Sequence, residues 1–222
     1  LHLAQSLAHG TLYVNRNVDE DDSVESYTGK IFESAMASLD QVHHSLDMSA
    51  VNRAVDLLTQ AKKIAFFGLG SSAAVAHDAM NKFFRFNVPV IYSDDIVLQR
   101  MSCMNCDDDD VVVIISHTGR TKSLVELAQL ARENDAMVIA LTSAGTPLAR
   151  EATLAITLDV PEDTDIYMPM VSRLAQLTVI DVLATGFTLR RGAKFRDNLK
   201  RVKEALKESR FDKEPFVPSD NQ

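Results

Sequence analysis

Two patterns in the sequence predict an α/β fold, a three-layer αβα sandwich around a five-stranded parallel sheet. Five short apolar runs alternate with segments whose apolar residues recur at helical spacing. Residues 111–115 are five consecutive β-branched residues, which is typical of a strand buried on both faces. Because short strands alternate with helices, the strands should pair in parallel and carry helices on both sides.

The first part of the chain precedes this alternation. Residues 1–9 have a helical pattern and residues 15–22 are polar and acidic. We therefore expect residues 1–22 to be the end of a missing N-terminal domain followed by a linker. Residues 23–47 form a predicted long helix, with Ser23 as its cap and an apolar stripe along one face. That stripe either packs on its own domain or forms a dimer interface.

The alternating region covers residues 48–193 and begins with a short helix. The predicted strands are residues 63–68, 88–92, 110–115, 136–142 and 153–158. Thr146 and Pro147 form a good helix start, with a capping hydroxyl followed by proline at the first helical position. A last apolar helix should run from about Pro169 to Arg190. Residues 194–222 are expected to form a basic amphipathic helix, to about residue 210, and a disordered tail.

Composition limits the class of protein. The 222 residues are 46% hydrophobic and carry a formal net charge of −8, which disfavours binding of nucleic acid by bulk electrostatics. The two cysteines, Cys103 and Cys106, fit a reducing compartment, and their spacing alone gives little support for a metal or redox site. No apolar run approaches the roughly 18–20 residues of a membrane span. A soluble cytoplasmic protein is therefore expected.

Two loops rich in hydroxyl groups follow predicted strands. The first loop is Gly68-Leu-Gly-Ser-Ser72, and the second loop is Ser116-His-Thr-Gly-Arg-Thr121. Free N–H groups at helix starts, together with hydroxyl donors, are the parts of a phosphate site. Serine and threonine also cap helices generally, and Ala73 is a permitted variant of the dinucleotide fingerprint, so Rossmann cofactor binding stays open for the first loop. The second loop lacks a Walker lysine pattern, which disfavours nucleotide hydrolysis.

Together the two loops resemble the paired phosphosugar loops of SIS (sugar isomerase) domains. The resemblance covers about residues 48–190 and implies a flavodoxin-like SIS fold. The flanking residues 13–18 and 170–177, with Asp181, resemble the effector half of RpiR-type transcriptional regulators. That likeness implies an N-terminal helix-turn-helix domain that binds DNA, and 2-keto-3-deoxy-6-phosphogluconate as the ligand that releases DNA. A homodimer is also expected.

The resemblance also assigns ligand contacts. Ser72 and Ser116 are the strongest, and Ser172 and Arg173 are expected to meet the rest of the sugar acid. Arg173 has an alternative role, an ion pair with Asp159 or Glu162. The complete predicted set is Gly70, Ser71, Ser72, Ser116, His117, Thr118, Gly119, Thr121, Ser172 and Arg173. No catalytic residue, metal or cofactor is expected.

Three functions remain possible from the sequence. A sensor needs only a pocket and two arrangements with different affinities for the ligand. A phosphosugar isomerase needs a general base near the reacting carbons, for which Glu162, Asp163 and His117 are open candidates. A purely structural dimerisation module would leave both hydroxyl loops unexplained. The RpiR-like flanks and the missing upstream domain favour the sensor.

Overall fold

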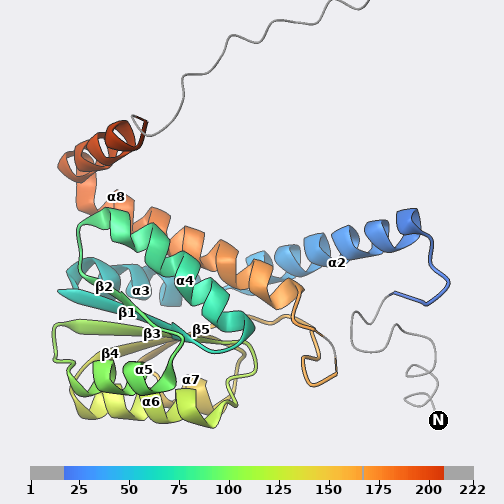
Figure 1. Ribbon diagram of the computed structural model, residues 1–222, viewed down its shortest axis with the longest axis horizontal. Coiled ribbons are helices and arrows are strands. Elements are labelled where there is room, and N and C mark those ends of the chain that lie inside the picture. The colour runs from blue at the N-terminus through green and yellow to red at the C-terminus, as the bar shows by residue number, and fades with distance from the viewer. Residues whose placement is uncertain (1–17, 167, 208–222) are drawn as a thin grey trace, which may run out of the picture.

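The computed structural model describes residues 18–166 and 168–207, without the side chains of Lys194 and Asn198. Five strands form one parallel sheet in the order β2-β1-β3-β4-β5 (Figure 1). The strands are β1 (Lys63–Gly68), β2 (Val90–Tyr92), β3 (Asp110–Ser116), β4 (Met137–Thr142) and β5 (Leu154–Thr157). The predicted fold class is therefore confirmed.

Seven helices of this part of the chain cover the two faces of the sheet (Figure 1). The first face carries α2 (Val24–Ser45), α3 (Met48–Gln60), α4 (Ser71–Phe83) and α8 (Val171–Lys207), and the 3-10 turn η1 (Phe84–Phe86) follows α4. The second face carries α5 (Ile96–Met104), α6 (Lys122–Glu133) and α7 (Pro147–Glu151). Right-handed parallel connections require helices on both sides of such a sheet.

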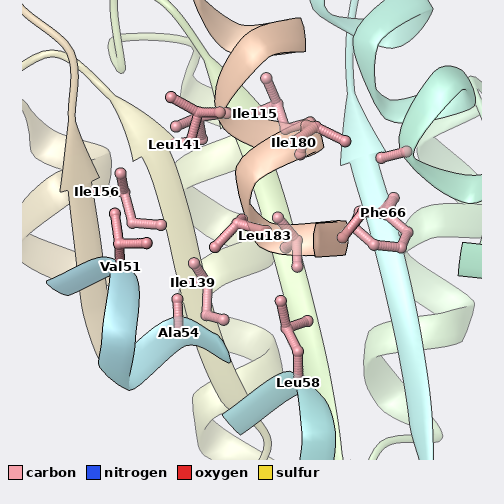
Figure 2. Packing of buried hydrophobic residues seen from close by; sticks show 14 of the residues in the cluster. Val51, Ala54, Leu58, Phe66, Ile115, Ile139, Leu141, Ile156, Ile180 and Leu183 are labelled. Atoms are coloured by element: carbon pink, nitrogen blue, oxygen red, sulfur yellow. The ribbon is translucent and has the colours of Figure 1, made fainter. Parts of the chain in front are cut away.

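The core lies in two layers because successive strand side chains point to opposite faces of the sheet. In β3, Val113 and Ile115 belong to the core layer between the sheet and helices α3 and α8. Val112 and Ile114 belong to the layer between the sheet and helices α5 and α6. Figure 2 shows the first layer, where Leu58 of α3 and Leu183 of α8 lie over the strands. All seven residues of β3 are buried, and the apolar run at residues 111–115 predicts this for five of them.

Helix α2 packs part of its apolar surface on its own domain. Toward its C-terminal end, Val42 is buried and Leu39 packs on the core. Toward its N-terminal end, which extends away from the sheet in Figure 1, Phe32 and Met36 are 65% and 60% exposed. Ser23 caps the helix as predicted, since its side chain accepts a hydrogen bond from the N–H of Ser26 at 3.1 Å.

The last helical run bends at Gly192, where φ is 76° and ψ is −164°. Two helices therefore meet at this residue, close to the predicted boundary between residues 190 and 194. No helix among the described residues has the length and hydropathy needed to span a membrane. The predicted helix at residues 1–9, the flank at residues 13–17 and the predicted tail at residues 212–222 lie outside the described residues.

Candidate functional site

The two hydroxyl loops lie at the point where the strand order reverses. β1 and β3 are paired neighbours, and Gly68 at the end of β1 lies opposite Ile115. From β1 the chain passes to β2 on one side, and from β3 it passes to β4 on the other. Ligands of open parallel sheets bind at this switch point, outside the carboxyl ends of the strands. The structure thus brings the two predicted loops together.

The first loop turns sharply into α4. A Cβ on Gly68 would lie 2.7 Å from the backbone oxygen of Ser72, and Gly70 has a φ of +57°. Both glycines are therefore required by the turn. The side chain of Gln99 holds the first loop in place and is fully buried. Its Nε2 donates hydrogen bonds to the backbone oxygen of Gly68 at 3.3 Å and to that of Ser93 at 2.7 Å. Ser72 is 7% exposed, and Ser71 is half-buried.

The second loop is tied to the segment that follows β4. The Ser116 hydroxyl is buried and accepts a hydrogen bond from the N–H of Gly119 at 3.2 Å. The backbone oxygen of Gly119 accepts from the N–H of Leu148 at 3.1 Å. The backbone oxygen of His117 accepts from both the N–H and the hydroxyl of Ser143. These bonds fix the loop backbone, so its remaining groups have defined directions.

The helices that start at these loops differ from the other helices in their caps. Helices α2, α3, α5 and α7 are each capped by a side-chain oxygen, from Ser23, Asp47, Asp95 and Thr146 respectively. The N-cap residues of α4 and α6 are Gly70 and Thr121, and neither makes a side-chain cap hydrogen bond. The N-terminal N–H groups of a helix attract anions because of the helix dipole. Two such helix starts therefore lie at the switch point with buried hydroxyl groups.

The start of α8 is capped by a residue distant in sequence. Glu162 accepts hydrogen bonds through Oε1 from the N–H groups of Met170 and Val171, at 2.7 and 2.8 Å. Its Oε2 accepts from the N–H of Ser172 at 3.1 Å and from the Ser172 hydroxyl. Burial by itself would raise the pKa of Glu162, but these hydrogen bonds outweigh it and lower the pKa below its ordinary value. Ser172, a predicted ligand contact, thus already bonds Glu162.

The basic residues near the two loops differ in their contacts. The exposed Arg120 forms an ion pair with Asp165 at 2.6 Å, which raises the pKa of the guanidinium. His117 contacts the backbone oxygen of Glu162 through Nε2 at 3.1 Å. Arg173 is exposed, and it forms no ion pair with Asp159, Glu162 or any other acidic residue in the described part of the chain. Thr118 and Thr121 are half-buried in the second loop.

Two other clusters lie apart from this site. Burial raises the pKa of the Cys103 thiol to about 12 and also raises the pKa of Cys106, so both thiols are poor nucleophiles. Adjacent residues on a helix, such as His43 and His44, are not expected to share a ligand face. Their ligand atoms nevertheless lie within 4.8 Å of each other and of a carboxylate oxygen of Asp40, and all three residues are exposed.

Comparison with known proteins agrees with this architecture. The SIS domain family model matches residues 57–186. The HTH-type transcriptional regulator HexR of Escherichia coli K12 is 91% identical over all 222 residues, which cover 77% of that protein. HexR of Pseudomonas aeruginosa is 56% identical over 95% of this chain and 74% of that protein. The NanR protein of Vibrio vulnificus, solved in complex with ManNAc-6P, has a TM-score of 0.77 at 23% identity, covering 85% of this chain and 72% of that chain.

The fold, the paired loops and the matched residues define the class of the protein as an SIS domain. Within that class, the chain belongs to the HexR family of HTH-type transcriptional regulators, because both HexR relatives match nearly all of it. The prediction of a ligand-sensing regulator of sugar metabolism is therefore confirmed. These relatives are named as transcriptional regulators and not as isomerases, in agreement with the expectation that the chain acts as a regulator.

Proposed function

We propose that this chain senses a phosphorylated sugar acid, with 2-keto-3-deoxy-6-phosphogluconate as the effector, and thereby controls DNA binding by an N-terminal helix-turn-helix domain. The observation that carries the proposal is the pair of helix starts at the switch point. Both lack a side-chain cap, and both lie beside the buried hydroxyl groups of Ser72 and Ser116. A dianionic phosphate satisfies such donors better than a neutral ligand does.

The number of donors is sufficient for binding at metabolite concentrations. A hydrogen bond to a charged group contributes about 1.5–3 kcal/mol, and micromolar affinity requires about 8 kcal/mol. About three to six such bonds meet this requirement. The donors that we assign to the phosphate are the side chains of Ser71, Ser72, Ser116, Thr118 and Thr121 with the backbone N–H groups of Gly70 and His117. The Gly119 N–H donates to the Ser116 hydroxyl and so orients that side chain.

The rest of the ligand is assigned to the start of α8. Ser172 is 1% exposed, while the neighbouring Arg173 is exposed and a guanidinium binds a carboxylate through two parallel hydrogen bonds. The backbone oxygen of Glu162 contacts His117 of the second loop and its side chain caps α8, so Glu162 links the second loop to the start of α8. This arrangement suits a ligand with a phosphate at one end and a carboxylate at the other.

The exposed part of α2 supports the proposal of a homodimer. Val24, Phe32 and Met36 are each 60–68% exposed on one helix, together with the partly exposed Tyr27. Large apolar side chains gathered on a protruding helix mark an interaction surface. A regulator that reads ligand through the relation between two subunits needs an interface of this kind.

The ligand assignment is tested by calorimetric titration of 2-keto-3-deoxy-6-phosphogluconate into the protein and its variants. Ser72→Ala and Ser116→Ala each remove a hydroxyl donor, and we expect each to weaken binding by about tenfold or more. Ser38→Ala is the matched control, because Ser38 is also 7% exposed but lies in α2. No heat of binding and no rise in melting temperature with the wild-type protein would refute the assignment.

A further inference from the structure

A short segment connects β5 to the start of α8 and crosses beside the second loop. We call residues 159–166 the strap. Two contacts join the strap to the second loop: His117 Nε2 meets the backbone oxygen of Glu162 at 3.1 Å, and Arg120 pairs with Asp165 at 2.6 Å. The strap therefore contacts the second loop through the Glu162 backbone and the Asp165 side chain, while the Glu162 side chain contacts α8.

The Glu162 carboxylate makes the contacts that a carboxylate ligand would make at this helix start. Each of its two oxygens accepts two hydrogen bonds, three in total from backbone N–H groups and one from the Ser172 hydroxyl. The helix dipole adds attraction for a negative charge at the same place. A second carboxylate cannot join this set, because two like charges that share a site repel each other.

A buried amide one turn farther along α8 adds a second observation. Gln176 is only 2% exposed, and it lies four residues after Ser172, on the same side of the helix. Its side chain makes no hydrogen bond to any group in the described part of the chain. Its polar atoms are not among the fully enclosed atoms that lack a partner, so the amide keeps some access to solvent and is available to a polar ligand group beside the start of α8.

We propose that Glu162 is a tethered competitor for the carboxylate of the sugar acid, an inference that rests on the function proposed above. When the ligand's carboxylate takes the N–H groups at the start of α8, Glu162 leaves them and the strap shifts relative to the second loop. A sugar phosphate that ends in an alcohol cannot replace the charge of Glu162 and leaves the strap in place. Glu162 thereby makes the response specific for acids and links ligand binding to α8.

The test compares two ligands that differ only at carbon 1. These are 6-phosphogluconate, which ends in a carboxylate, and glucitol 6-phosphate, which ends in an alcohol. Glu162→Gln removes the competing charge, so we expect its affinity for the acid to rise about tenfold while its affinity for the alcohol stays unchanged. Glu133→Gln is the matched control, since Glu133 is an exposed carboxylate on α6.

A second variant keeps Glu162 and loosens the strap. Asp165→Asn removes the exposed ion pair with Arg120, which leaves folding intact and should raise affinity for the acid alone, by about twofold to fivefold. Equal changes for the two ligands, or weaker binding of the acid by Glu162→Gln, would overturn the competitor role while leaving the sensor function in place. If neither these ligands nor 2-keto-3-deoxy-6-phosphogluconate binds any variant, the proposed function falls as well.

Discussion

Replacing Gly119 by alanine tests whether the second loop is held as tightly as its contacts indicate. Gly119 has a φ of +57°, which costs about 1–2 kcal/mol for a residue with a Cβ. The new Cβ would lie 2.5 Å from Thr142 Oγ1 and 2.6 Å from Thr146 Cβ. Neither threonine can move freely, because Thr142 is 1% exposed within β4 and Thr146 caps α7. Overpacking adds about 1–3 kcal/mol, so the total destabilisation should be about 2–5 kcal/mol.

The matched control is Gly145→Ala. Gly145 also has a positive φ, +70°, but a Cβ added there would meet nothing within 4 Å. Urea unfolding followed by circular dichroism should therefore give a lower midpoint for Gly119→Ala than for Gly145→Ala, with equal slopes. The difference between the two variants isolates the steric contribution. Equal midpoints would refute the conclusion that Thr142 and Thr146 confine the second loop.

Two further predictions concern Glu162 and α2. Because the pKa of Glu162 is lowered in the folded protein, its carboxylate contributes stability above the ordinary value of 4.5. The excess melting temperature of the wild-type protein over Glu162→Gln should therefore shrink as the pH falls below 4.5 and through the lower pKa of the folded protein, and a constant difference would contradict the assigned cap. Phe32→Glu should convert a dimer into a monomer in sedimentation experiments without lowering the melting temperature much. Leu189→Glu, at a residue that is 66% exposed on α8, is its control, and a dimer that survives Phe32→Glu excludes this interface.

The strands of the sheet could be predicted well because each one is marked by a short, contiguous apolar run in the sequence. All five predicted strands form, and their ends differ from prediction by at most two residues. The largest difference is at β2, where pairing with β1 begins at Val90, after Pro89. Proline has no N–H to contribute to a ladder, so the apolar run at residues 88–92 is longer than the strand. The loops were recognised for the same reason, since glycines and hydroxyl residues at strand ends are local in sequence.

Contacts between distant residues could not be predicted in the same way. Gln99 supports the first loop from 31 residues away, and Glu162 caps α8 across an intervening segment. Neither role has a signal in periodicity or spacing. Charge alone made ion pairs of Arg173 with Asp159 or Glu162 reasonable predictions. In the structure, both oxygens of Glu162 instead accept hydrogen bonds from backbone N–H groups and from Ser172. The carboxylate of Glu162 therefore binds the backbone N–H groups at the start of α8 and not the guanidinium of Arg173.

The geometry of Glu162 and His117 also explains why this switch point suits sensing better than catalysis. A general base works best when its pKa lies near the operating pH. The pKa of Glu162 is lowered instead, and both of its oxygens already accept hydrogen bonds. His117 Nε2 faces a carbonyl oxygen, which can only accept, so that nitrogen donates a hydrogen bond. Of the three sequence candidates for an isomerase base, Glu162 therefore uses its carboxylate to cap α8, and His117 uses Nε2 to hold the strap against the second loop.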